Sequence, residues 1–166
     1  MDNQILEQLY LRYGREILLY LFSLCKNWDM AEDLKQETFV KAIFSLSEQH
    51  TNMRAWLYHV ARNLCINQMA KEKRFAALED YEGILKKDED ILEQYITQEE
   101  HRSVYLAVLK LPTPKKEILE LQYFGGLSLK EIAELLHLTY EGVRVQKHRA
   151  KQELKKILEE ENYDIS

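Results

Sequence analysis

Residues 128–157 read SLKEIAELLHLTYEGVRVQKHRAKQELKKI, and the fold of the chain is best predicted from this segment. Ser128 is a favourable helix N-cap, and Glu131 three residues later completes a capping box at the start of a short helix. A tight turn is expected at 137–139, where the leucine would plug the core and Thr139 would cap a second helix. Two capped helices across a three-residue turn are typical of a helix-turn-helix.

The second of these helices concentrates positive charge. Between positions 140 and 156, six Lys and Arg residues stand against two acidic residues, Glu141 and Glu153. If Val143, Ala150, Leu154 and Ile157 form its buried stripe, the opposite face carries the groups that can contact base edges in the major groove: Arg144, Val145, His148, Arg149 and Gln152. Side chains on the flanks and at the start of the first helix are expected to contact phosphates: Lys147, Lys151, Lys155, Ser128 and Lys130. The alternative is a helical hairpin whose basic face is only solvated.

The composition of the whole chain fits a helical protein. Its 166 residues include five Gly and two Pro, and the apolar residues recur at helical spacing, so we expect an all-α fold. The net charge of −5 is unfavourable for binding nucleic acid, but residues 75–100 alone hold nine acidic and two basic residues. The charge is therefore segregated along the chain, and the C-terminal helix keeps its basic character.

Several function classes find no support in the sequence. There is no Gly-rich phosphate loop, metal-ligand spacing or nucleophile motif, so we expect no enzyme, no metal and no cofactor. Cys25 and Cys65 lie in apolar helical patterns without a CxxC spacing, and we expect buried free thiols. Without a signal-like or membrane-spanning apolar run, we expect a cytoplasmic protein with no membrane insertion.

The N-terminal part predicts three helices. The first carries apolar residues at helical spacing from Leu6 to Leu24, and the second is capped by Asn27 or Asp29. One face of the second helix is apolar, and the other mixes carboxylates with apolar groups: Asp33, Gln36, Glu37, Val40 and Phe44. We interpret the mixed face as a partner-docking surface rather than a water-facing one.

The third helix runs from Met53 to about Lys73 and ends in a basic cluster. Beyond it the apolar period weakens and acidic residues accumulate, a composition typical of a weakly ordered segment. Helical periodicity resumes at Val104 and is interrupted at Pro112–Pro114. We therefore expect two small helical domains, residues 1–74 and 99–160, joined by an acidic flexible linker at 75–98.

Three blocks of this sequence resemble the extracytoplasmic-function (ECF) group of bacterial sigma factors, in the sigma-70 family. They are Met30–Ala42, Ala55–Asn67 followed by Lys71–Arg74, and Leu111–Leu154. The resemblance covers nearly the whole chain apart from the linker. It implies an alternative sigma factor that binds core RNA polymerase, recognises promoter DNA and promotes DNA melting.

The resemblance also implies a role for each block. The first would bind the β′ clamp of polymerase through Asp33, Gln36, Glu37 and Val40. The second would recognise and open the minus-ten element, with Asn63 beside a pocket for a flipped base, through Trp56, Asn63, Asn67, Lys71, Lys73 and Arg74. The third, a domain that also contacts the β flap, would bind the minus-thirty-five element through Arg144, Val145, His148 and Arg149. For Trp56, a place in the core is an equal alternative.

The chain departs from the family pattern at several positions. His137 stands where the turn usually has Gly, Glu141-Gly142 replaces a common Gly-Thr pair, Gln146 replaces an Arg, and Asn67 replaces an Asp. These departures bear on which promoter sequence is bound. The resemblance further implies an anti-sigma factor, often membrane-bound, and a linker that passes through a positively charged polymerase channel; a plain solvated tether is the alternative.

Two other functions compete with this interpretation. A helix-turn-helix transcriptional regulator could use the same C-terminal module without being a polymerase subunit, but it would not need the block at 56–74. An adaptor that binds polymerase without binding promoter DNA would lack the basic helix, which is present here.

Overall fold

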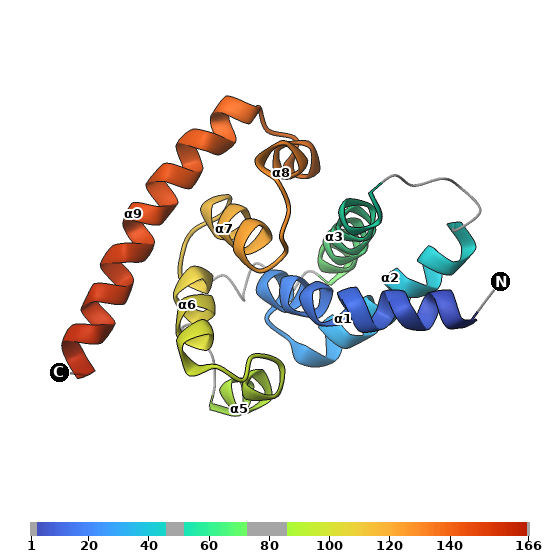
Figure 1. The fold of residues 1–166 in the computed structure, drawn as a ribbon, viewed down its shortest axis with the longest axis horizontal. Helices are drawn as coiled ribbons and strands as arrows, with labels where there is room; N and C mark the ends of the chain where they lie inside the picture. The colour runs from blue at the N-terminus through green and yellow to red at the C-terminus, as the bar shows by residue number, and fades with distance from the viewer. Residues whose placement is uncertain (1–2, 46–51, 73–85, 166) are drawn as a thin grey trace. The chain divides into compact units, whose positions relative to one another are not determined.

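The computed structural model describes residues 3–45, 52–72 and 86–165. Over these ranges the chain forms helices and no strand, which confirms the all-α prediction (Figure 1). The chain divides into two compact units, Met1–Glu82 and Gly83–Ser166.

In the described part of unit 1, residues 3–45 and 52–72, the chain forms helices that pack against one another: α1 (Asn3–Cys25), α2 (Trp28–Ser45) and α3 (Met53–Lys71). The apolar face of α1 predicted from its periodicity supplies much of the core. This core contains two aromatic pairs. The ring of Phe22 stacks on that of Trp28 with centroids 3.8 Å apart, and the ring centroids of Tyr20 and Tyr58 are 5.2 Å apart. Such contacts add to the stabilisation from burial alone.

The junction between α1 and α2 is set by two residues. Lys26 adopts a left-handed backbone conformation with a φ of 54°, and its N–H donates to the carbonyl of Phe22 at 2.8 Å. The side-chain oxygen of Asn27 accepts from the Met30 N–H at 3.1 Å. Of the two caps left open by the sequence, Asn27 is therefore the one used.

A polar cluster on Glu16 links α1 to α3. Its Oε1 accepts hydrogen bonds from Arg54 Nε at 2.9 Å and from the Tyr58 hydroxyl at 3.3 Å. Burial raises the pKa of Glu16 above its ordinary value, and the hydrogen bond from Arg54 opposes that shift. The pairing thus offsets part of the cost of placing a carboxylate between two helices.

Between residues 86 and 165, the described part of unit 2, the helices are α5 (Lys86–Tyr95), α6 (Glu99–Leu109), α7 (Lys115–Tyr123), α8 (Leu129–Leu136) and α9 (Tyr140–Ile165). Helix α5 lies within the expected linker, whose first part, 75–85, is outside the described residues. Leu92 and Ile96, four residues apart on one face, are buried. These apolar contacts order a segment whose acidic composition predicts little structure.

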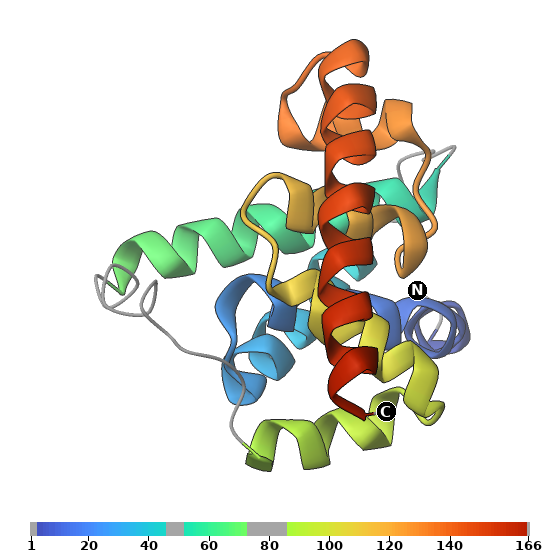
Figure 2. The same ribbon diagram turned by 90° about the vertical axis from the view of Figure 1, so that its left-hand side faces the viewer.

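Helix α9 packs against most of the other helices of unit 2. It lies across α6 and α7 and also contacts α8 (Figure 2). The core beneath it contains Val108, Leu111, Leu119 and Ala150, with Val104, Leu154 and Ile157 packed against them. The predicted inner stripe of α9 is therefore confirmed, and it leaves the opposite side of the helix uncovered.

Candidate nucleic-acid and partner interface

The helix-turn-helix begins with the predicted capping box. Ser128 Oγ accepts from the Glu131 N–H at 3.1 Å, and Glu131 Oε1 accepts from the Ser128 N–H at 2.8 Å. Two backbone N–H donors at the start of α8 are thus satisfied locally by side-chain oxygens. The Ser128 hydroxyl keeps its own proton for donation to a further partner.

The turn between α8 and α9 depends on a left-handed residue. His137 has a φ of 58° and a ψ of 41°, the conformation that the family's usual Gly adopts easily. Thr139 Oγ1 then accepts from the Gly142 N–H at 3.0 Å, which confirms the predicted cap. The expectation that Leu138 plugs the core is wrong: this side chain is 39% exposed, and Leu135 is buried at that end of α8.

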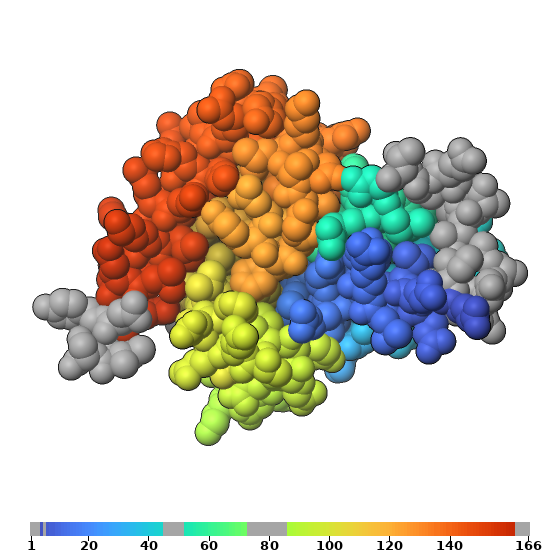
Figure 3. Space-filling view, in the orientation of Figure 1, coloured from blue at the N-terminus to red at the C-terminus, as the bar shows by residue number. Residues whose placement is uncertain are grey.

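The four residues predicted to contact bases come together on the uncovered side of α9. Arg144, Val145, His148 and Arg149 are all exposed and line one shallow hollow, together with Glu141. Val143 and Ala150 on the opposite side of the helix are fully buried. We name the four exposed residues, Arg144, Val145, His148 and Arg149, the α9 outer face. The space-filling view shows α9 as a strip along one edge of unit 2 (Figure 3).

Within the hollow, Arg144 has two partners on its own helix. Its Nη1 donates to the two carboxylate oxygens of Glu141 at 3.2 and 3.4 Å. The guanidinium carbon also lies 6.0 Å from the centroid of the Tyr140 ring, at the limit of a cation–π contact. The side chain of Arg144 is 56% exposed, so it remains accessible to a ligand.

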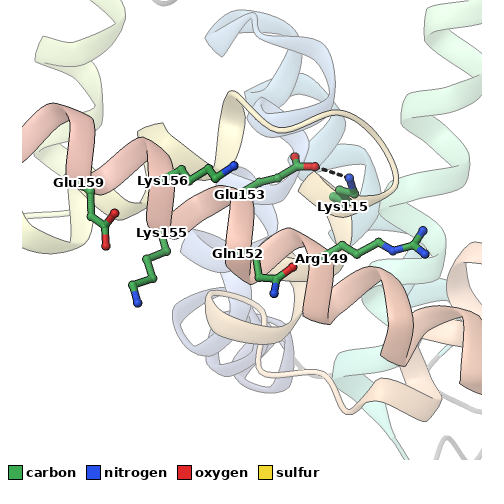
Figure 4. Close-up of a pocket in the computed structure, with 7 residues that line it drawn as sticks. All are labelled: Lys115, Arg149, Gln152, Glu153, Lys155, Lys156 and Glu159. Atoms are coloured by element: carbon green, nitrogen blue, oxygen red, sulfur yellow. Dashed lines mark hydrogen bonds and ion pairs between the residues drawn. The ribbon is translucent and has the colours of Figure 1, made fainter.

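A second hollow lies further along α9 (Figure 4), lined by Lys115, Arg149, Gln152, Glu153, Lys155, Lys156 and Glu159. Lys115 at the start of α7 forms an ion pair with Glu153, which neutralises that acidic residue. The exposed predicted phosphate contacts Lys151 and Lys155 flank this part of the helix, while Lys147 is half-buried. Sequence reasoning did not single out Lys115, because only the packing of α7 on α9 brings it to this face.

The mixed face of α2 is exposed. Asp33, Gln36, Glu37, Val40 and Phe44 are exposed, and we name them the α2 outer face. Val40 and Phe44 are 49% and 82% exposed, which is unusual for large apolar side chains. Asp33 and Glu37 also line a hollow with Gln68 of α3 and with Glu72, the residue that follows this helix.

Of the residues expected to contact the minus-ten element, those that the structure describes lie on α3. Asn63, Asn67 and Lys71 are exposed and Trp56 is half-buried. Positions 63 and 67 follow position 56 by seven and eleven residues, so the three positions share one face of the helix. A half-buried Trp56 fits both the core and the DNA-contact interpretation. Lys73 and Arg74 lie outside the described residues.

The two thiols are buried and form no disulfide, as predicted. A hydrogen bond with the Cys65 side chain lowers the pKa of Cys25, against the effect of burial. Among residues 3–45, 52–72 and 86–165, no group of three or more His, Cys, Asp or Glu side chains is arranged to hold a metal ion. None of the helices in this described part has the length and apolar character needed to cross a bilayer.

Comparison with known proteins agrees with this arrangement. Residues 9–75 match the family model for Sigma-70 region 2, and residues 101–154 match that for Sigma-70, region 4. The RNA polymerase sigma factor YlaC of Bacillus subtilis is 36% identical over 156 residues, covering 91% of this chain and 90% of the relative. The chain belongs to the sigma-70 family.

Further relatives in this family confirm the resemblance to the ECF group. The ECF RNA polymerase sigma factor SigM of Bacillus subtilis is 29% identical and covers 92% of this chain and 94% of its own length. The fold matches that of the sigma factor RpoE from Bartonella quintana, solved with the anti-sigma factor NepR, at a TM-score of 0.67 and 23% identity. That alignment covers 92% of this chain and 96% of RpoE.

The family defines the function at the level of the whole chain: it is an alternative RNA polymerase sigma factor, a transcription initiation factor. The rival interpretation as an independent helix-turn-helix regulator is not favoured. An independent regulator of this kind would not account for the match of residues 9–75 to Sigma-70 region 2.

Proposed function

We propose that three exposed helix faces of this sigma factor each bind a different target. The α2 outer face binds core polymerase, α3 binds and opens the minus-ten element, and the α9 outer face binds the minus-thirty-five element. The observation that carries the proposal is the gathering of Arg144, Val145, His148 and Arg149 around one hollow opposite a buried stripe. Arg can donate two hydrogen bonds to guanine, and Val can contact a thymine methyl group.

For the minus-ten element, we assign the central role to Asn63. Its exposed amide offers both a donor and an acceptor, which a base removed from the stack requires for recognition. Asn67 extends the same face, and Lys71 supplies positive charge for the phosphates. Trapping an unstacked base in this way would promote melting, and the protein itself would catalyse no reaction.

For polymerase, the α2 outer face combines acidic groups with two exposed apolar side chains, Val40 and Phe44. Such a surface suits a partner that offers both basic and apolar groups, since buried apolar contacts at the centre of an interface contribute most of its affinity. We propose that this partner is the β′ clamp of polymerase and that unit 2 contacts the β flap.

The same faces are candidates for regulation. Two proteins of this fold were solved with partners, the sigma factor RpoE with the anti-sigma factor NepR and CnrH with the cytosolic domain of CnrY. By analogy, we propose that an anti-sigma factor covers a polymerase-binding or DNA-binding face of this chain in the cytoplasm until an inducing signal releases it.

The decisive experiment is transcription in vitro with purified core polymerase and genomic DNA fragments. The full chain should direct initiation at a defined set of promoters and co-elute with core polymerase in gel filtration. Absence of both results would refute the proposal.

A docking variant tests the assignment of α2. Val40→Asp should weaken the complex with core polymerase at least tenfold, because it places a charge at an apolar contact of the interface. Its free energy of unfolding should stay within about 0.5 kcal/mol of the wild type, because the side chain is exposed. Lys41→Asp, at a neighbouring exposed position outside the assigned set, serves as the control, and an equal loss in both variants would contradict the assignment.

A further inference from the structure

Two thiols lie in contact inside unit 1, and the proposed function gives them no role. Cys25 is the last residue of α1 and Cys65 belongs to α3, and they are 1% and 0% exposed. A hydrogen bond joins the two side chains, so the packing of α1 on α3 brings together two sulfur atoms that are distant in sequence. The chain has no other cysteine, and each thiol therefore has only the other for an intramolecular disulfide.

Each thiol also has a second neighbour. Cys25 Sγ donates to the carbonyl of Asn27 at 3.4 Å, and Cys65 Sγ donates to Met69 Sδ at 3.6 Å. The hydrogen bond from Cys65 lowers the pKa of Cys25, although burial acts in the opposite direction. Because the thiolate is the reactive form of cysteine, this contact favours Cys25 as the attacking sulfur. A thiol that only fills space in a core needs no such partner.

A hollow between α2 and α3 gives a small molecule a path toward Cys25. Asn27, whose carbonyl accepts from Cys25, lies on its rim, and so does Glu72, whose charge acts on the same thiol. The hollow measures about 420 Å³, whereas one water molecule occupies about 30 Å³. Since Cys25 ends its helix beside this rim, a local opening of the α1–α2 junction is enough to expose its sulfur.

We propose that Cys25 and Cys65 form a reversible oxidation site, at which hydrogen peroxide converts the two thiols of the free chain into a disulfide. The Cys25 thiolate attacks one peroxide oxygen, the O–O bond breaks, and a sulfenic acid forms while the second oxygen takes up a proton and leaves as water. The Cys65 sulfur then attacks the Cys25 sulfur, the S–O bond breaks, and the hydroxyl leaves as water with the Cys65 proton. The two thiols thereby lose two electrons and two protons, and the peroxide is reduced to two molecules of water.

The same hollow connects this site to polymerase. Asp33 and Glu37 of the α2 outer face also line it, so polymerase bound there would cover the path to Cys25; this step rests on the proposed function of α2. In the disulfide, Cys25 Sγ lies about 2 Å from its new partner and can no longer donate to Asn27, the cap of α2. The oxidised free chain should therefore bind core polymerase more weakly, by roughly twofold to tenfold, the range for one lost hydrogen bond.

The experiment treats the full-length chain with hydrogen peroxide, alkylates the remaining thiols after denaturation, and measures the intact mass. The wild type should lose two hydrogens, take up no alkylating reagent, remain a monomer on a non-reducing gel and recover both thiols with dithiothreitol. A digest should contain the Cys25 peptide linked to the Cys65 peptide. These results use the wild-type chain alone, so they do not depend on the folding of a variant.

Two single variants, which serve as matched controls, test the order of the steps. Cys65→Ala should stop at the sulfenic acid, with a gain of one oxygen, because the second sulfur is absent. In Cys25→Ala, Cys65 should remain open to alkylation much longer than the thiols of the wild type. Oxidation of Cys65 in this variant at the wild-type rate would contradict the role of Cys25 as the attacking sulfur.

A second arm repeats the treatment with core polymerase in excess, and digestion followed by mass spectrometry identifies the peptides of this chain. Bound polymerase should slow disulfide formation at least tenfold, and Val40→Asp, which we expect to bind polymerase weakly, should lose this protection. Gel filtration of the oxidised and reduced chains with polymerase measures the expected difference in affinity. Equal affinity of the two forms would contradict the effect of the disulfide on α2.

Three results would overturn the oxidation site: a disulfide between two chains, a gain of oxygen at Met69 in place of the loss of two hydrogens, or two thiols that stay reduced. A disulfide that forms in the free chain and equally fast in the complex with polymerase would leave the site intact and contradict the proposed place of polymerase on α2. The failure of this proposal and that of the proposed function are thus distinguishable.

Discussion

Arg149 and Lys151 stand two residues apart on α9 and carry the same charge, yet we expect them to act differently. Arg149 belongs to the outer face, so Arg149→Ala should cost about 1 to 3 kcal/mol at one promoter position and relax selection there. Lys151→Ala should weaken binding evenly across sequences and reduce the slope of log affinity against log salt by about one. Competition binding on promoters with single base changes, repeated at several salt concentrations, measures both quantities.

The same measurements can contradict this division. An even loss on every promoter for both variants would mean that Arg149 contacts phosphates only. A position-dependent loss for Lys151→Ala would move that residue into the base-contacting set.

Glu16 gives a pH dependence with a defined sign. Its pKa is raised in the folded state, so the folded protein holds this proton more tightly than the unfolded chain. Relative to Glu16→Gln, the free energy of unfolding of the wild type should be greatest below about pH 4.5 and fall as the pH rises through the raised pKa. Urea denaturation of both proteins from pH 4 to 7 gives this difference.

The Arg54→Ala variant is a test of the cause. Because the Arg54 hydrogen bond opposes the raised pKa, its removal should extend the fall to higher pH. An unchanged pH profile in Arg54→Ala would show that the pairing has no effect on the ionisation of Glu16.

At the scale of an element, α8 depends on its capping box. Ser128→Ala removes the acceptor for the Glu131 N–H and should lower the free energy of unfolding by about 1 kcal/mol. Lys130→Ala, an exposed change in the same turn, should have little effect. Chemical denaturation of the full chain distinguishes the variants, and equal stability of both would mean that the cap contributes nothing measurable.

The elements that could be predicted from the sequence are those fixed by neighbours in the chain. Ser128 with Glu131, and Thr139 at the start of α9, act within four residues, and their hydrogen bonds form as expected. Helix α5 was not predicted, because its order depends on burial of Leu92 and Ile96 in unit 2. The apolar spacing of these two residues was the signal, and the surrounding acidic residues obscured it.

The candidate site divides along the same line. The α9 outer face follows from helical periodicity once the buried stripe is known, so its residues could be assigned from the sequence. The ion pair between Lys115 and Glu153 joins two helices distant in sequence, and only the packed structure reveals it. The minus-ten assignment came from family resemblance, since exposed Asn residues on a helix have no distinctive pattern of their own.

At the scale of the whole molecule, one chain contains the two units that we propose to contact DNA. We expect the free chain to bind promoter DNA weakly, and assembly with core polymerase to raise the affinity by roughly 10²- to 10⁴-fold, because the second contact becomes intramolecular. Titration of promoter DNA with the chain, core polymerase and both together measures this gain. Promoters lacking either element should lose most of it, and retention of full affinity on either one would contradict the two-contact model.

Helix α9 keeps its packing residues and its exposed residues on opposite sides, with Val143 and Ala150 buried and Arg144 and Arg149 accessible. Substitutions on the accessible side therefore carry little folding penalty. After a gene duplication, one copy can drift to a new set of target genes through point mutations along this side while the scaffold stays intact. Because the two sides of the helix are separate, substitutions that change the set of target genes need not lower the stability of the fold, and selection for stability does not oppose them.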